Sequence, residues 1–298
     1  MAPVSLPARP DQTSPERPAI LRSRLLQAPA GVFGSLIRHR QLIGQMAMQE
    51  VRSRYRGSVL GLFWSFANPL LQLAIYTLVF GYIFEARWGI EAESGAGGGK
   101  LGFAVVLFSG LILHTFLIEC LVRAPTLLHQ HSNLVKRVVF PLEVLPWVVV
   151  ASALFHLVVG LGVLLMAALA VFGSLPWTAL LAPLTLASLV LMAAGVSWFL
   201  ASTGLYFRDI AQATGPLAMI LLFISPILFP VERLPVLFQK LILLNPLTIP
   251  VEQLRAVLIF GHLPDWILLG WHLLAGLIVA WIGYYWFART RKSFADIL

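Results

Sequence analysis

Three arginines stand at alternate positions, Arg52, Arg54 and Arg56, directly before an uncharged apolar run that begins near Gly61. A guanidinium group presents a planar fork of donors that matches phosphate oxygens. These side chains could therefore bind an anionic headgroup at a membrane surface. Arginines in this position also set membrane topology and attract anionic lipids, so both interpretations stay open.

Ionisable side chains inside apolar segments are the other candidates for chemistry, here His114, Glu119, His156 and His272. Hydrogen bonds between packed helices explain each of them more simply than a proton relay. The sequence has no GxxxxGK[ST] loop, HExxH or CxxC, so we expect no nucleotide, no metal and no cofactor to be bound by this chain. With no nucleophile or acid/base cluster either, we expect no catalytic residue.

The composition is that of a membrane protein. Hydrophobic residues make up 59% of the 298, and only 11% are charged, against roughly 25% in soluble domains. The net charge of +8 comes from basic residues beside apolar segments and not from a basic face, which argues against nucleic acid as a partner.

Six segments are long and apolar enough to cross a bilayer, which takes roughly 20 residues. They are 62–84, 101–122, 147–172, 178–206, 211–229 and 265–287, the fifth being the shortest. Six crossings place both termini on one side. Of the basic residues, sixteen then fall on that side and five on the other, so the positive-inside rule makes it the cytoplasm.

The flanking segments complete a predicted all-α integral membrane architecture. Residues 1–31 are rich in Pro and Arg and are expected to be a disordered cytosolic arm, and 289–298 a cytosolic tail. Residues 32–56 alternate apolar and polar side chains at helical spacing, which predicts an amphipathic helix along the inner membrane surface, before the six-span domain 57–288.

Residues 231–264 form the most unusual segment. Two apolar pieces, each too short to cross, are joined by NPLT at 245–248. Two short helices that enter the outer leaflet and return fit this pattern, because such a re-entrant backbone is tolerated where protein or a water-filled cavity covers it. An outer loop lying on the membrane surface is the alternative.

The loop 123–146 contains a helix-length stretch suited to docking a partner at the inner face. Its contact candidates are Leu127, Leu128, Leu134, Val135, Lys136, Arg137 and Val138, with Arg208 and Asp209 in the next inner turn. An ordinary connecting loop on the headgroups is equally compatible with the pattern.

Aromatic side chains in and before the first apolar segment could stack on a polar substrate or face lipid. They are Tyr55, Trp64, Phe66, Tyr76, Phe80, Tyr82 and Phe84. In the fourth span, the small residues Ala193, Ser197 and Ala201 form a ridge that predicts packing against a neighbouring helix.

Four stretches in order give a family resemblance: RSRYRGSVLGLFWSFANPLL, NLVKRVVFPLEVLP, LYFRDI followed by ISPILF, and LNPLT followed by VEQLRAVL. The chain thereby resembles type-2 ABC transporter permeases that export polysaccharides, with O-antigen exporters nearest and capsule and teichoic-acid exporters next. The resemblance covers about residues 35–290.

The resemblance implies a homodimer in the bacterial inner membrane. Each subunit would be bound to one of two copies of a separate ATPase that uses ATP and Mg, and the dimer would export a lipid-linked polysaccharide. The same resemblance makes the segment before the first span an interface helix, the loop after the second span a coupling helix, and the segment with Asn245, Pro246 and Arg255 a gate. Drug or small-molecule efflux is the alternative within this class, and a membrane transferase acting on lipid carriers is the alternative outside it.

Overall fold

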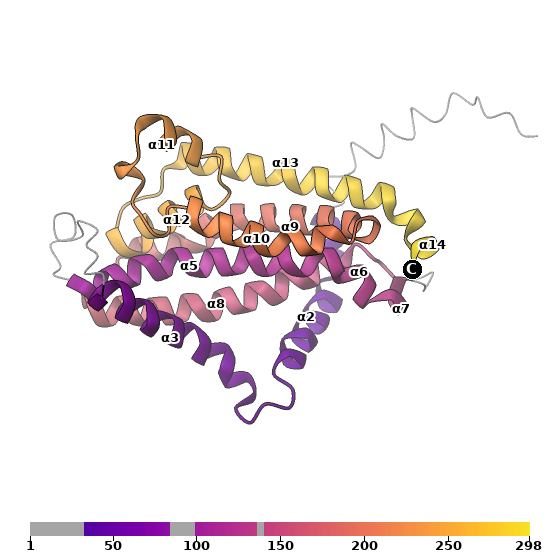
Figure 1. Cartoon of the computed structure of the whole chain (residues 1–298), viewed down its shortest axis with the longest axis horizontal. Helices are drawn as coiled ribbons and strands as arrows, with labels where there is room; N and C mark the ends of the chain where they lie inside the picture. Colours follow the sequence, from indigo (N-terminus) through magenta and orange to yellow (C-terminus); the bar gives the residue numbers. More distant parts are fainter. Residues whose placement is uncertain (1–32, 84–98, 136–139) are drawn as a thin grey trace, which may run out of the picture.

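The computed structural model describes residues 33–83, 99–135 and 140–298, and all regular elements in these ranges are helical. The predicted N-terminal arm, Phe84, and the coupling candidates Lys136, Arg137 and Val138 lie outside the described residues, as does the side chain of Tyr82. The long helices run side by side as an elongated bundle (Figure 1).

Five helices are long and apolar enough to cross a membrane: Gly61–Phe80, Leu101–Gln130, Val144–Phe172, Trp177–Tyr206 and Trp266–Ser293. The main α-helices of these spans are, respectively, α3 (Trp64–Tyr76), α5 (Gly99–Arg123), α8 (Val144–Phe172), α9 (Ala182–Tyr206) and α13 (Trp266–Thr290). The all-helical membrane class is therefore confirmed, with five spans of full length where the sequence predicts six.

The predicted fifth span at 211–229 is shorter than expected. Helix α10 covers Asp209–Ile224, which is 16 residues or about 24 Å at 1.5 Å per residue, against about 30 Å of hydrocarbon. Its end is set by Pro226, since a residue before proline disfavours the helical conformation and Ser225 is indeed extended.

Helix α5 is the centre of the bundle. In the most apolar 18-residue stretch of the span that contains α5, 78% of the residues are buried. In the same length of Gly61–Phe80, only 11% are buried. The helix contacts α8, α9, α10 and α12 (Thr248–Arg255), with Phe103, Phe108 and Phe116 fully enclosed. The first span is therefore attached at the periphery, with most of its surface free.

Helix α2 (Arg40–Arg54) and α3 form an open V on one side of the bundle (Figure 1). Ile43, Ala47 and Val51 bury the apolar side of α2, which packs against α8. The elbow between the two helices uses Gly57 and Gly61, whose φ angles of +86° and +50° are left-handed values that favour glycine. The predicted helix before the first span therefore exists, with its apolar face against protein.

The segment before the last span contains two short helices, α11 (Val236–Ile242) and α12, at the end of the bundle opposite α6 (Leu127–Gln130) and α7 (Ser132–Val135) (Figure 1). Buried Asn245 stabilises the connection between α11 and α12: it donates to Ser225 Oγ at 2.9 Å and accepts from the Leu247 amide at 2.9 Å. Two short helices joined at NPLT are thus present, and their re-entry into the membrane stays a prediction.

Glycine residues let the backbones of α9 and α13 come into direct contact. A Cβ built on Gly195 would lie 2.5 Å from backbone atoms of Val279 and Ala280. Close approach through small residues is a common way for apolar helices to associate in a membrane. The predicted ridge of Ala193, Ser197 and Ala201 is fully buried in the same helix, so its packing role is confirmed.

A methyl group at Gly195 should force these helices apart. We expect Gly195→Ala to lower stability by about 1–3 kcal/mol, the usual cost of overpacking, and to lower the thermal unfolding midpoint in detergent. Gly270→Ala is the matched control because no atom lies within 4 Å of its Cβ position on α13. Equal midpoints for the two variants would mean that the helices do not pack this closely.

Candidate functional site

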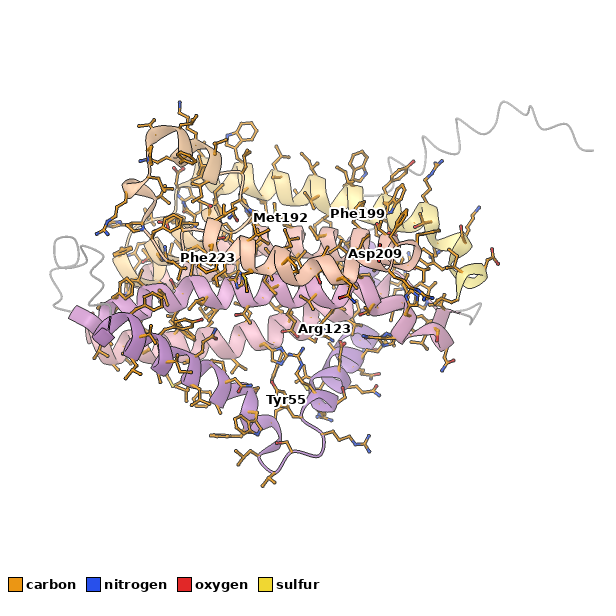
Figure 2. All side chains as sticks on the ribbon, viewed as in Figure 1. Tyr55, Arg123, Met192, Phe199, Asp209 and Phe223 are labelled. Carbon is orange, nitrogen blue, oxygen red and sulfur yellow. The ribbon has the colours of Figure 1, made fainter. Side chains whose placement is uncertain are left out.

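An ion-pair network joins the end of α2 to the bundle. Glu119 of α5 is its centre: its carboxylate lies 2.8 Å from Arg54, 2.9 Å from Arg123 and 2.9 Å from His156 Nδ1 of α8. Arg123 also pairs with Glu50 of α2. Figure 2 places Arg123 and Tyr55 on the side where α2 approaches α5 and α8.

The network is electrically balanced. Two carboxylates, Glu50 and Glu119, face two guanidinium groups, Arg54 and Arg123. The imidazole of His156 lies between the Glu119 carboxylate, 2.9 Å from Nδ1, and the Tyr55 hydroxyl, 3.3 Å from Nε2. Burial raises the pKa of Tyr55, which keeps that hydroxyl protonated as a donor. The predicted packing role of Glu119 and His156 agrees with this geometry.

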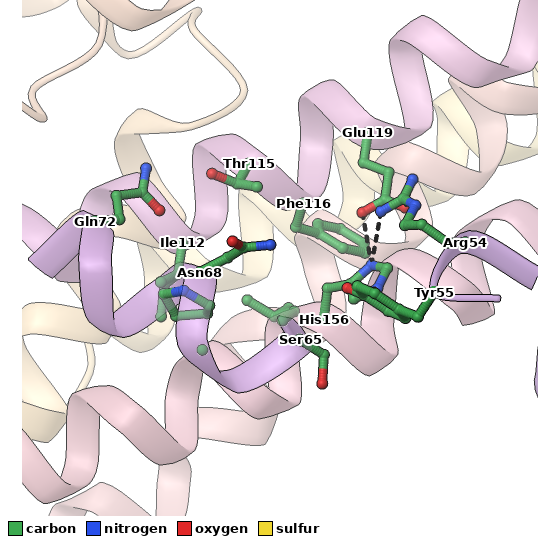
Figure 3. Close-up of a pocket in the computed structure, with 13 residues that line it drawn as sticks. Arg54, Tyr55, Ser65, Asn68, Gln72, Ile112, Thr115, Phe116, Glu119 and His156 are labelled. Atoms are coloured by element: carbon green, nitrogen blue, oxygen red, sulfur yellow. Dashed lines mark hydrogen bonds and ion pairs between the residues drawn. The ribbon is translucent and has the colours of Figure 1, made fainter. Parts of the chain in front are cut away.

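A cavity of about 150 Å³ lies against this network (Figure 3). Arg54, Tyr55, Glu119 and His156 form one end. The opposite end is lined by polar side chains of the first two spans. They are Asn68 and Gln72 of α3 and Thr115 of α5. The cavity therefore offers a charged end and an uncharged polar end between membrane helices.

The three juxtamembrane arginines divide into two groups. Arg54 turns toward the bundle and pairs with Glu119. Arg52 and Arg56 are exposed and line an open groove on the outer face of α2, together with Gln45 and Gln49. Only Arg52 and Arg56 keep their donors available for an outside anion in this conformation.

The predicted aromatic residues do not share one surface. Tyr76 and Phe80 have ring centroids 6.0 Å apart, and Phe80 continues to Phe103 of α5 at 6.2 Å. Phe66 packs partly against the core, and Trp64 is half-buried near the elbow. Tyr76 and Phe80 thus fasten the first span to α5 instead of forming an exposed stacking surface.

The apolar coupling candidates are mostly inside the protein. Leu127, Leu128 and Val135 are buried in the core and Leu134 packs against it. The expectation that these side chains are available for a contact is therefore corrected: α6 buries its apolar side against α8 and α9, and Val135 of α7 is enclosed in the core.

Several exposed side chains at the same end are polar, beside the exposed aromatic residues Tyr206 and Phe207. The polar ones include Gln130, Asn133, Arg208 and Asp209. Within the described ranges no ion pair joins Arg208 to Asp209.

Of the charged side chains that the structure describes in residues 231–264, Arg255 is the most enclosed, at 1% exposure. Its guanidinium donates to the carbonyls of Pro226 at 2.7 Å and Ile227 at 3.3 Å, and it pairs with Glu252 at 2.9 Å. Its Nε also reaches Val106 and Ser109 of α5 at 3.3 Å. Arg255 therefore joins three separate segments, whereas Pro246 contributes a carbonyl that accepts from His272 at 3.2 Å.

Comparison with known proteins identifies the family. The family model described as ABC-2 type transporter matches residues 41–259, which is more than half of the chain. This chain belongs to the ABC-2 transporter membrane family. The suspected relationship is thereby confirmed, and with the spanning helices it makes the protein a multi-pass inner-membrane permease.

Three relatives are named for the transport of glycans. The O-antigen export system permease protein RfbA of Myxococcus xanthus is 25% identical, over 88% of this chain and 96% of the relative. RfbA of Klebsiella pneumoniae is 26% identical over 84% and 92%. The polysialic acid transport protein KpsM of Escherichia coli is 25% identical over 83% and 92%. This ABC-2 permease is therefore homologous to permeases of two kinds of glycan export.

Sequence reasoning missed several residues of the ABC-2 permease cavity. Asn68 and Gln72 are four positions apart in an uncharged run, and this amide pair on one helix face was a usable signal. The pairing of Glu50 with Arg123 gave no such signal, because the two lie 73 positions apart and on different helices.

Proposed function

We propose that this permease is the membrane subunit of an ATP-driven exporter that moves a lipid-linked polysaccharide of O-antigen type from the cytoplasmic side across the inner membrane. The observation that carries the proposal is the family membership over residues 41–259 together with relatives named for O-antigen and polysialic acid export. ATP and Mg would be used by a separate ATPase subunit, two copies of which would act on a homodimer of this chain.

Deletion of the gene tests the proposal. We expect polysaccharide to vanish from the cell surface and its lipid-linked form to accumulate inside, with export restored by the wild-type chain. Unchanged surface polysaccharide in the deletion strain would reject the proposal.

The proposed topology has six crossings, with α10 as a short fifth span, α2 at the inner surface, and α11 and α12 as a re-entrant pair on the outer side. The basic bias of sixteen to five supports this orientation. The gate role of Asn245, Pro246 and Arg255 belongs to the same proposal.

The proposed ATPase contact is at the end of the bundle with α6, α7 and the turn between α9 and α10. Cysteines at Gln130 and Asp209 are expected to react with a membrane-impermeant reagent only in inverted vesicles, and bound ATPase is expected to protect them. Leu263→Cys is the control, since Leu263 is 56% exposed and lies at the opposite end. Labelling of Gln130→Cys from the periplasm would contradict the orientation, and labelling unaffected by the ATPase would move the contact elsewhere.

The proposed headgroup site uses Arg52 and Arg56, with Arg54 held by Glu119 until a substrate competes for it. Lysine keeps the charge needed for topology and loses the bidentate fork. We expect Arg52→Lys with Arg56→Lys to insert normally and to slow export of polysaccharide by roughly ten-fold, the equivalent of one charge-assisted hydrogen bond. Arg40→Lys on the same helix is the control, and export at the wild-type rate in the double variant would exclude pyrophosphate recognition by these two residues.

A further inference from the structure

The ion-pair network accounts for the charged residues at one end of the cavity, but not for the uncharged polar residues at the other end. Asn68 and Gln72 are one turn apart on α3, about 6 Å along its axis, and Thr115 faces them from α5. Figure 3 shows these three side chains together at one end, with Phe116 between them and the charged end. The polar groups of two spans therefore converge on one space.

These side chains have unmet hydrogen-bonding capacity. Within the described part of the chain, the side chains of Asn68, Gln72 and Thr115 make no hydrogen bond. Pro69, which also lines the cavity, has no amide hydrogen to donate to the Ser65 carbonyl one turn earlier. An amide without a partner in an apolar environment costs free energy, so polar residues in spans usually face another polar group or a water-filled space.

The donors and acceptors at the uncharged end of the cavity indicate which class of ligand could bind there. The carboxylates and guanidinium groups of the neighbouring end already pair with one another, so they do not call for a further ion. Carboxamides donate and accept at once, as does a threonine hydroxyl. A ligand rich in hydroxyl groups presents the matching mixture of donors and acceptors, whereas a lipid tail presents neither. Asn68 is exposed at the open side of the cavity, which gives such a ligand a way in.

We infer that Asn68, Gln72 and Thr115 form a sugar-binding subsite, which takes the hydroxyl groups of one sugar ring of the lipid-linked glycan while Arg54 and Tyr55 occupy the adjoining charged end. The inference rests on the proposed export function. It adds a named contact for the sugar, separate from any contact with the phosphate groups.

Apolar replacements test the subsite without endangering the fold, because removing polar groups from a span does not disturb membrane insertion. The probes are polyprenyl diphosphate and the same lipid carrying one N-acetylglucosamine, added to the permease and its ATPase in nanodiscs. We expect the wild type to bind the sugar-bearing lipid more tightly. Asn68→Leu with Gln72→Leu should lose that preference, with roughly ten-fold weaker binding of the sugar-bearing lipid and unchanged binding of the bare lipid. Gln41→Leu on α2 is the matched amide control.

Three results would overturn the inference: equal binding of both lipids by the wild type, a preference retained by the double variant, or loss of the homodimer in the double variant, which would assign the amides to a contact between copies. Each of these is distinct from failure of the export function, which the deletion strain reports separately.

Discussion

Arg255→Met is expected to destabilise the protein more than any other single replacement of a charged residue. The side chain is 1% exposed and donates to the carbonyls of Pro226 and Ile227 and to groups on α5. Without the guanidinium, buried carbonyls of an irregular segment lose their donor, and buried acceptors without donors are costly. We expect a loss of about 3–5 kcal/mol, the range for breaking a buried ionic contact.

The measurement is the thermal unfolding midpoint in detergent, which we expect to fall by on the order of 10 °C. Lys240→Met on neighbouring α11 is the control, because Lys240 is exposed and should change stability by no more than about 0.5 kcal/mol. Arg255→Lys should lie between them, since an ammonium group has three donors and cannot span all the acceptors. Equal unfolding midpoints for Arg255→Met and Lys240→Met would show that the buried contacts of Arg255 with α5 and with the segment after α10 do not stabilise the fold.

Arg123→Leu is expected to produce the second-largest loss, on the order of 3 kcal/mol. This arginine pairs with Glu50 and Glu119 and donates to Ser152 at 2.7 Å. Its removal leaves two carboxylates that are largely enclosed, with side-chain exposures of 23% and 9%. The end of α2 should also come away from α5 and become more accessible to protease.

A combined replacement separates charge imbalance from loss of packing. Leucine at Glu50 and Arg123 together removes one charge of each sign and keeps the ion pair between Glu119 and Arg54, so most of the lost stability should return. Arg208→Leu in the exposed turn before α10 is the control for loss of a basic residue at this end. If this double variant is no more stable than Arg123→Leu, the network is not what holds α2 in place.

The fold class could be predicted from sequence because it depends on local properties. Apolar runs of span length, an amphipathic segment before the first span and the NPLT break are each visible within a window of 30 residues. Helix ends were harder. The end of α10 depends on Pro226 and on a contact with Arg255, which is distant in the chain.

The candidate site was only partly predictable because its geometry is set by long-range packing. Arg52, Arg54 and Arg56 are equally spaced in the sequence, but they differ in the structure. Arg54 pairs with Glu119 of the bundle, whereas Arg52 and Arg56 stay exposed. Leu127 and Leu128 look like contact residues by composition, yet they fill the core beneath α9. Only the position of neighbouring helices decides whether an apolar side chain in a short helix is buried or exposed.

Transport in inverted membrane vesicles tests the central claim most directly. Vesicles that contain the permease and its ATPase are loaded from outside with radiolabelled lipid-linked polysaccharide, and the polymer that becomes protected from an added glycosidase is measured. The account predicts protection that requires ATP and is abolished by an ATPase variant unable to hydrolyse it. Protection that is equal with and without ATP, or absent while the complex is intact and hydrolyses ATP, would contradict the assignment as a polysaccharide export permease.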